Sequence, residues 1–526
     1  GLFVGGGGGG IYISHNNGGD WLETTLGLPK SDMGKIGLAV TPANPSLLYA
    51  TIEANEEDRG FYRSQDGGES FEKKNSYISG GTGPHYYMEL EASPTDADVV
   101  YQMDVFVRVT RDGGKTFEIL ESGWSKHSDN HAFWIDPKNS DHLLVGTDAG
   151  LYESFDDGKN WRHSSNLPIS QFYKVAMDNT EPFYNILGGA QDLGTISGPS
   201  RTMTTDGVRN QDWYVPSGAD GYGVAFDPND NNIQYMEFQE GVLFRLNKNT
   251  QELIGIQPQS GPDEAPERWN WDTPVVTSSH VTGRIYVGSQ RVWRSDDRGN
   301  NWTPISGDLT KSINRYTLEY AGRVWSVDDL HDNGAMSKYS TITAISESPL
   351  DKALLYSGSD DGLINVTLDG GKNWVKSGKL PGVPNTAFIN DVDAGLHNKT
   401  TVYAIADAHK TGDYNPYIFR STNNGGSWRS IKGDLPVGLI LWAIQEDHIN
   451  SNLLFLGAED GLYVSINGGT NWNKFGGAPT IPFRDVKLQR RDNDIVGATF
   501  GRGFYILDDY APLREIADKG LQNGLL

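Results

Sequence analysis

Residues His127 to Pro137 read HSDNHAFWIDP and could bind a metal ion, because His127, Asp129 and His131 alternate just before a short apolar run. Imidazole nitrogens are common zinc ligands, and carboxylate clusters suit Ca²⁺. On an extended strand, residues four positions apart lie roughly 13 Å apart, so both histidines cannot reach one ion at about 2 Å. A metal site would therefore combine Asp129 and one histidine with another segment, for example His85. The alternative is that these side chains cap strand ends and form hydrogen bonds across strands.

The composition limits the partners of the chain. It has 526 residues, a net charge of −24 and a pI near 4.8, whereas nucleic acids and anionic membranes attract basic surfaces. Cysteine is absent, which excludes disulfides and thiolate metal sites. No apolar run is long enough to span a membrane, and no signal-peptide pattern stands at the N-terminus, so we expect any export signal to lie outside these residues. We expect a protein, peptide or glycan partner, no nucleic acid and no direct membrane insertion.

One turn pattern recurs along the chain: Ser/Thr-x-Asp/Asn-x-Gly-x-x-Trp/Phe. Its eight copies are SHNNGGDW from Ser14, SQDGGESF from Ser64, TRDGGKTF from Thr110, SFDDGKNW from Ser154, SDDRGNNW from Ser295, TLDGGKNW from Thr367, STNNGGSW from Ser421 and SINGGTNW from Ser465. The long gap between the fourth and fifth copies fits three units, two of which have lost the turn. Repeats of about 40–50 residues are typical of β-propeller blades.

Each repeat also carries apolar runs joined by a Gly-Asp turn, as in LLFLGAEDGLYVS from Leu453, which indicates a hairpin. The repeat is therefore predicted to be four antiparallel strands, and the chain an all-β propeller over residues 1–516. We expect one large propeller of about ten blades, with two smaller tandem propellers as the alternative. The expected units are 1–33, 34–80, 81–121, 122–168, 169–216, 217–260, 261–310, 335–382, 383–436, 437–480 and 481–510, with an insertion at 311–334 and a tail at 517–526 leading to further chain.

The turn pattern itself is predicted to be structural, since eight copies cannot all be active sites. The Asp or Asn should accept backbone N–H groups, the Gly should adopt positive φ, and the aromatic residue should pack between blades. The expected capping residues are Asn16, Asp66, Asp112, Asp156, Asp296, Asp369, Asn423 and Asn467. The expected interblade aromatic residues are Trp21, Phe71, Phe117, Trp161, Trp302, Trp374, Trp428 and Trp472.

Ligands are expected on the opposite face, where the loops between blades and the turns between second and third strands meet. The candidate binding residues that map to this face are His85, His127, Asp129, His131, Gln191, Asp192, Asp220, Asn270 and Arg502. Of these, His85, His127, Asp129 and His131 are the candidate metal ligands, for Ca²⁺ or Zn²⁺, and no other cofactor is expected. We predict that His127, Asp129 and His131 converge with His85 and with Asp192 or Asp220 at the channel mouth.

The turn pattern resembles the Asp-box, or BNR repeat, of sialidases, other glycoside hydrolases and the sortilin (VPS10) propeller. The stretches HSDNHAFWIDP, ISQFYKVAMDNTEPFYNILGGAQDLGT, RWNWDTPVV and VGATFGRGFYILDDYAPL resemble a bacterial family of sortilin N-terminal-like proteins, over nearly the whole chain. The resemblance implies an exported bacterial Asp-box propeller, often labelled a glycosyl hydrolase. The sequence departs from these families: it lacks the sortilin cysteines, the sialidase arginine triad and the TDxGG-like hairpin of tandem-propeller xyloglucanases.

Two functions are compatible with these features. The favoured interpretation is a binding or structural module that holds a peptide, glycan or partner subunit, because none of the known catalytic motifs is present. The alternative is a glycosidase that uses a carboxylate pair drawn from Asp129, Asp192, Asp220 and Asp272. Such a pair must lie about 5 Å apart for retention or 6.5–9.5 Å apart for inversion of the sugar.

Overall fold

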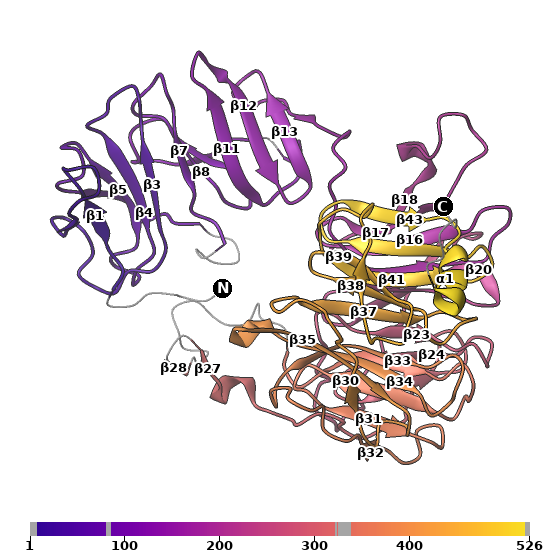
Figure 1. Ribbon diagram of the computed structural model, residues 1–526. Helices are drawn as coiled ribbons and strands as arrows, with labels where there is room; N and C mark the ends of the chain where they lie inside the picture. Colours follow the sequence, from indigo (N-terminus) through magenta and orange to yellow (C-terminus); the bar gives the residue numbers. More distant parts are fainter. Residues whose placement is uncertain (1–7, 80–85, 122, 321–322, 325–337, 521–526) are drawn as a thin grey trace. The chain divides into compact units, whose positions relative to one another are not determined.

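The computed structural model describes residues 8–79, 86–121, 123–320, 323–324 and 338–520 (Figure 1). Contacts divide the chain into two compact units: residues 1–167 with 316–336, and residues 168–315 with 337–526. Nearly all regular structure is β, which confirms the predicted fold class. The exceptions are α1 (Pro512–Lys519) and the short 3-10 turns η1 (Asn210–Asp212), η2 (Arg315–Thr317) and η3 (His409–Thr411). No helix among the described residues is long and apolar enough to cross a membrane.

The first unit contains three four-stranded antiparallel sheets and two short hairpins. The four-stranded sheets are β3 (Ile36–Val40), β4 (Leu48–Ile52), β5 (Gly60–Ser64) and β6 (Glu72–Asn75); β7 (Leu90–Ala92), β8 (Val100–Gln102), β9 (Arg108–Thr110) and β10 (Glu118–Ile119); and β11 (Asn130–Asp136), β12 (Asn139–Thr147), β13 (Gly150–Ser154) and β14 (Arg162–His163). The hairpins are β1 (Ile11–Ile13) with β2 (Leu22–Thr24), and β27 (Glu319–Tyr320) with β28 (Arg323–Val324). The first strands of consecutive four-stranded sheets pack on one another, as propeller blades do.

The second unit contains seven sheets, which we number as blades 1 to 7. In order they are β15 (Phe172–Met177), β16 (Asn185–Ala190), β17 (Gly194–Pro199), β18 (Tyr214–Ser217); β19 (Gly221–Asp227), β20 (Asp230–Phe238), β21 (Val242–Asn247), β22 (Glu252–Gly255); β23 (Val275–Thr277), β24 (Ile285–Gly288), β25 (Val292–Ser295), β26 (Thr303–Pro304); β29 (Ile342–Glu347), β30 (Leu355–Ser359), β31 (Ile364–Thr367), β32 (Val375–Lys376); β33 (Phe388–Ala394), β34 (Val402–Ala408), β35 (Asp413–Ser421), β36 (Arg429–Ser430); β37 (Leu441–Glu446), β38 (Leu454–Ala458), β39 (Gly461–Ser465), β40 (Asn473–Lys474); and β41 (Phe483–Gln489), β42 (Asp494–Thr499), β43 (Gly503–Leu507).

These seven blades close into a ring. Each first strand packs on the first strand of the next blade, and β41 of blade 7 packs on β15 of blade 1 (Figure 1). Backbone hydrogen bonds also join blades 7 and 1. Gly501 N donates to Ser170 O at 2.8 Å, and Gln171 and Phe500 form an isolated antiparallel β-bridge. The expected single ring of about ten blades over residues 1–516 is therefore not found. Repeat spacing counts blades, but it does not tell where a ring closes, and the alternative of smaller propellers fits the second unit better.

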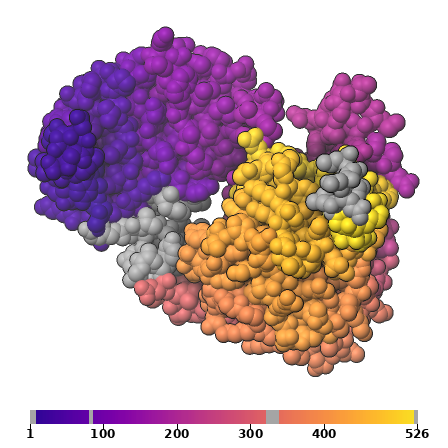
Figure 2. Space-filling view, viewed as in Figure 1, coloured from indigo at the N-terminus to yellow at the C-terminus, as the bar shows by residue number. Residues whose placement is uncertain are grey.

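The blades of the second unit are held together by apolar contacts between neighbours. The middle strands β34 and β38 are buried along their whole length because a blade covers each of their faces. One cluster joins Tyr403 and Ile405 of β34 to Ile444 of blade 6. In the space-filling view, the yellow C-terminal strands lie directly against the orange strands of the preceding blades (Figure 2).

The repeated turns adopt the predicted structure between the third and fourth strands. In the fifth copy the Ser295 hydroxyl and the Asn301 backbone N–H both donate to Asp297 Oδ1 at 2.8 Å. The prediction of Asp296 as the capping residue was therefore wrong by one position, because Asp296 pairs with Arg284 and Arg294 instead. The other seven predicted residues accept a hydroxyl hydrogen bond from the first residue of their turn.

The turn aromatics pack between blades in the second unit. The Trp302 and Trp374 indoles donate to the carbonyl oxygens of Ile256 and Ile305 in the preceding blades, at 2.7 and 2.8 Å. Trp428 and Trp472 make similar bonds to the preceding blades. Trp21 of the first unit is 62% exposed, so the prediction of burial is wrong at that position. The two-stranded β1–β2 sheet provides too little surface to cover it.

The pair Asp296 and Asp297 gives a matched test of the capping role. We expect Asp297→Ala to destabilise the second unit by about 1–2 kcal/mol, because three donors lose a charged acceptor. Asp296→Ala should cost less than about 1 kcal/mol, since the Asp296 side chain in its two ion pairs is 47% exposed. Urea unfolding of the two variants measures the difference. Equal midpoints would contradict the capping role.

Candidate functional site

The HSDNH segment enters β11 as predicted, but its side chains have separate partners. Tyr87 and Ser128 donate hydrogen bonds to the Asp129 carboxylate. His131 Nε2 lies 2.9 Å from Asp148 Oδ1, an ion-pair contact without a linear hydrogen bond, and its ring stacks on Tyr87. His127 Nδ1 contacts Ser128 O at 3.1 Å. These contacts match the strand-capping alternative.

The predicted metal site has little support in the described part of the chain. His85 lies outside the described residues, and the described residues contain no group of three or more His, Cys, Asp or Glu side chains that could hold a metal ion. The predicted convergence of Asp129 with Asp192 or Asp220 assumed a single ring. Asp129 belongs to the first unit, whereas Asp192 and Asp220 belong to the second.

Within the second unit, a repeated irregularity shapes the inner wall of the ring. The pairing of the first and second strands shifts register near the start of the first strand in six of the seven blades. The residues at these β-bulges are Tyr173, Tyr222, Thr343, Asn390, Trp442 and Arg484. Bulges redirect a side chain out of the regular pleat, and they are frequent next to active sites. We call these six residues the bulge belt.

The bulge belt lies toward the blade ends that carry the interblade loops. Thr343 Oγ1 and Asn390 Nδ2 each donate, at 2.8 Å, to a carbonyl oxygen of the next blade, which ties the belt together. The Tyr173 ring lies 4.7 Å from Tyr222 and 5.2 Å from Phe500. Tyr173 thus packs against an aromatic ring of the next blade and one of the last blade.

Three predicted aspartates act electrostatically on Tyr173. Burial raises the pKa of the Tyr173 hydroxyl, and the negative charges of Asp272, Asp220 and Asp192 raise it further. The Tyr173 hydroxyl donates to Gln191 Oε1 at 2.7 Å. Asp192 N donates to Asp220 Oδ1 at 2.8 Å, which joins the turn of blade 1 to the loop that precedes blade 2.

The backbone of these loops is held in an uncommon conformation. Asp192 and Ala219 adopt positive φ values of 59° and 63°. Non-glycine residues rarely adopt such values, and they cluster at functional sites where the surrounding structure holds them in place.

Asp272 has the chemistry of a buried acid. Burial raises the pKa of Asp272. A hydrogen bond from Tyr222 and the positive charges of Lys410, Lys174 and Arg484 offset part of this rise. A carboxyl group with a raised pKa keeps its proton to higher pH and can act as a general acid.

The other predicted residues of this face do not join the group. Asn270 is buried and donates to Thr341 Oγ1 at 2.7 Å and to Asp360 Oδ2 at 3.2 Å, which is a structural role. Arg502 lies in the β42–β43 turn, where its backbone N–H donates to Thr499. Its side chain makes no hydrogen bond or ion pair with the described residues.

Deeper in the ring, charged side chains of β33 and β41 face one another. Lys487 Nζ lies 3.5 Å from Asp485 Oδ1, and the charges of Asp485, Asp391 and Asp393 raise the pKa of Lys487 against the effect of burial. Asp485 Oδ2 accepts the Val175 N–H of blade 1 at 3.1 Å, and Asp391 Oδ2 accepts the Ile444 N–H of blade 6 at 3.0 Å. These carboxylates thus join neighbouring blades.

Sequence reasoning missed the bulge belt and these inner charges. A bulge depends on strand pairing and leaves no local signature. A weaker signal was available, because NDVDA from Asn390 and RDVKL from Arg484 both place charges on either side of a buried valine.

The buried carboxyls predict a pH dependence of stability. Burial raises the pKa of Asp360 to about 7 and that of Asp393 to about 8. The folded chain thus holds protons that the unfolded chain releases near pH 4, so the free energy of unfolding should fall as pH rises from about 4 to 8. Each of these carboxyl groups changes the free energy of unfolding by at most about 1.4 kcal/mol per pH unit, and by less where solvent screens its charge. Melting temperatures between pH 5 and 8 test this, and Asp393→Asn should flatten the slope. An unchanged slope in that variant would refute the assignment.

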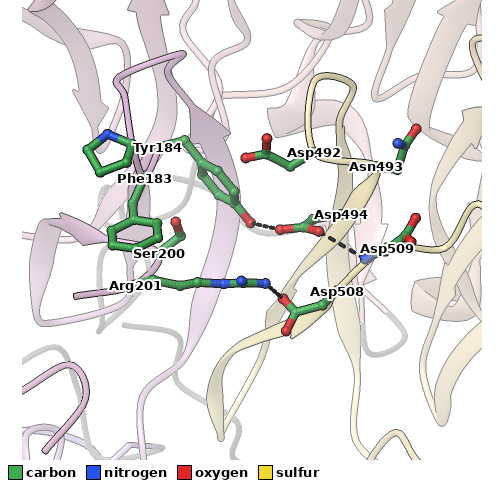
Figure 3. A pocket seen from close by; sticks show the side chains of 10 residues that line it. Phe183, Tyr184, Ser200, Arg201, Asp492, Asn493, Asp494, Asp508 and Asp509 are labelled. Carbon is green, nitrogen blue, oxygen red and sulfur yellow. Dashed lines mark hydrogen bonds and ion pairs between the residues drawn. The ribbon is translucent and has the colours of Figure 1, made fainter. Parts of the chain in front are cut away.

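A second feature lies on the other face of the ring, at the closure (Figure 3). A pocket of about 400 Å³ is lined by turns of blades 1 and 7. The Tyr184 hydroxyl donates to Asp494 Oδ2 at 3.0 Å, and Arg201 pairs with Asp508. These bonds between the first and last blades indicate that the pocket residues hold the ring closed.

Comparisons with known proteins bear on the function. No family model matches the chain. It is 23% identical to a xyloglucanase of Hypocrea jecorina over 88% of its length and 22% identical to a xyloglucanase of Paenibacillus sp over 93%. The chain spans about half the length of these curated relatives, 50% in both cases. A crystal structure of the Niastella koreensis GH74 enzyme aligns over 96% of this chain and 84% of that chain, with 14% identity and a TM-score of 0.28.

These relatives correct two interpretations of the sequence. The favoured function, a binding or structural module, is wrong, because the curated relatives are named xyloglucanase. The leaning against an enzyme is likewise not supported. Both interpretations rested on the absence of known catalytic motifs from the sequence.

Proposed function

We propose that the chain acts as a glycoside hydrolase whose carboxylates lie at the bulge-belt end of the second unit. The observation that carries this proposal is the bonded group of Tyr173, Gln191, Asp192 and Asp220, on which the charge of Asp272 also acts. Glycosidases need two carboxyl groups flanking the bond they cleave, one protonated and one ionised. The names of the curated relatives support the same reaction class.

In this proposal Asp272 is the general acid. Its raised pKa keeps it protonated, so that it donates a proton to the glycosidic oxygen as the bond from that oxygen to the anomeric carbon breaks. Asp220 is the second carboxylate. The Asp192 N–H donates to its Oδ1 and holds it in orientation. The aromatic faces of Tyr173, Tyr222 and Phe500 hold the sugar rings.

The remaining expectations belong to the same proposal. An extracellular polysaccharide would require an exported protein, in agreement with the Asp-box resemblance. In this proposal, the resemblance to sortilin N-terminal-like proteins concerns the fold and not the activity.

Release of reducing ends from polysaccharides tests the proposal. The purified chain is incubated with soluble xyloglucan, an unsubstituted β-glucan and a xylan, and we expect new reducing ends from at least one of them. The anomer formed first shows whether the carboxylates act by retention or inversion. A folded protein that releases no reducing ends from the whole panel would contradict the proposal.

A further inference from the structure

Three cations of the second unit that act electrostatically on the proposed acid form no ion pair with any carboxylate of the described residues. Lys174, Lys410 and Arg484 come from blades 1, 5 and 7, and the charge of each acts on Asp272. Within the described residues, none of the three has a carboxylate oxygen within 4.0 Å or a hydrogen bond to the protein. Three cations therefore stand at one end of the ring with their charge uncompensated by a direct partner.

Several other arginines of the second unit have direct acidic partners, in a chain whose net charge is −24, although Arg420, Arg429 and Arg502 have none among the described residues. Arg298 lies 2.8 Å from Asp227, Arg491 lies 2.8 Å from Asp492, and Arg514 lies 2.7 Å from Asp447. Lys410 is exposed, whereas Lys174 and Arg484 are half-buried, and a half-buried cation without a partner is costly unless a ligand supplies the counter-charge.

Each of the three cations rests on an aromatic face instead. The Arg484 guanidinium carbon lies 3.6 Å from the Trp442 ring centroid and 4.8 Å from that of Phe500. Lys410 Nζ lies 4.7 Å from the Phe388 centroid, and Lys174 Nζ lies 6.0 Å from that of Tyr222. Cation–π contacts hold the side chains in place and leave their N–H donors unused.

Arg484 is the best placed of the three to recognise an anion. Its position in a β-bulge turns it out of the pleat, and contacts with Trp442 and Phe500 restrict its planar group. Its Nε is buried and has no hydrogen-bond partner. A planar guanidinium fork matches the two oxygens of a carboxylate, which it binds through paired hydrogen bonds.

We propose that the sugar bound at this site carries a carboxylate, as a uronic acid residue does, and that Arg484 binds this carboxylate with Lys174 and Lys410 supplying further positive charge. This inference rests on the proposed glycoside hydrolase function and names its substrate class. The belt aromatics Tyr173 and Tyr222 would stack on the ring of the uronic acid, while its charged group faces Arg484. The substrate would then differ in charge from the one for which the relatives are named.

Binding to a matched pair of oligosaccharides tests the inference. One oligosaccharide bears glucuronic acid, and the other is its carboxyl-reduced, neutral form. Calorimetry with the full chain carrying Asp272→Asn, which prevents turnover, should give a Kd at least about 10-fold lower for the charged form. Arg484→Gln in the same background should bring the ratio of the two Kd values near one, and Arg484→Lys should leave a ratio in between. The control Arg429→Gln replaces an exposed arginine of β36 and should leave the ratio unchanged.

The outcomes separate this inference from the proposed function. Equal binding of the two oligosaccharides, no binding of either, or an unchanged ratio in the folded Arg484→Gln variant would overturn the uronate site. Hydrolysis of neutral polysaccharides by the unmodified chain would still support the glycosidase function in those cases. Conversely, charge-selective binding without any hydrolysis would support the uronate site and overturn the function.

Discussion

Replacement of Asp272 by Asn should lower kcat on the best polysaccharide substrate by roughly 10²–10⁴-fold, the usual contribution of a positioned general acid. The change keeps the shape of the side chain but removes the proton that the leaving group needs. Because burial raises the pKa of Asp272, we expect the activity of the unmodified chain to be lost as pH rises through that pKa, and the variant should lose this basic limb. KM should change much less than kcat.

The control for this prediction is Asp206→Asn, which alters an exposed aspartate of the β17–β18 loop whose partner is Arg209. It should leave kcat and KM unchanged. Substrates with an activated leaving group need little protonation, so their cleavage by Asp272→Asn should be reduced far less than that of the polysaccharide. An equal loss on both kinds of substrate would show that Asp272 is not the acid.

The local structure of the blades could be predicted because it is encoded over a few residues. The Gly-Asp hairpins and Asp-box turns depend on positive φ and on short hydrogen bonds, which residue types reveal directly. The off-by-one assignment at Asp296 arose because both aspartates fit the pattern, and only the bonds of Asp297 to Ser295 and Asn301 distinguish them.

The closure of the ring could not be predicted in the same way. It depends on contacts between β15 and β41, which lie more than 300 residues apart in sequence, such as the bond from Val175 to Asp485 with a separation of 310. Every blade pair looks alike in sequence, so nothing local says that blade 7 meets blade 1.

The site was predictable in part. Asp192, Asp220 and Asp272 lie in the loops that the strand order predicts, between β16 and β17, before β19 and before β23. Tyr173 and Arg484 could not be predicted, because they lie at β-bulges. The position of a bulge follows from strand pairing and not from residue type. For HSDNH, residue types suggested a metal site, whereas the partners of the side chains indicate a hydrogen-bonded strand cap.

The ring closure gives the second large prediction. Asp485 is 2% exposed, and its carboxylate accepts N–H groups from Val175 and Val486 while it faces Lys487. Replacement by Ala would leave a buried N–H without an acceptor and reduce the negative charge around a lysine within the ring. We expect Asp485→Ala to lower the free energy of unfolding of the second unit by about 3–5 kcal/mol, measured by urea unfolding.

A double-mutant cycle identifies the source of this loss. If the unpaired Lys487 matters, Asp485→Ala combined with Lys487→Met should cost less than the sum of the two single changes, because the double variant has no Lys487 charge left without its Asp485 partner. Asp485→Asn, which keeps an oxygen acceptor for Val175 N–H, should cost less than Asp485→Ala. Asp206→Ala is the surface control and should stay within about 0.5 kcal/mol of the unmodified chain. Strictly additive effects in the cycle would mean that the loss comes from the Val175 hydrogen bond and not from the unpaired lysine.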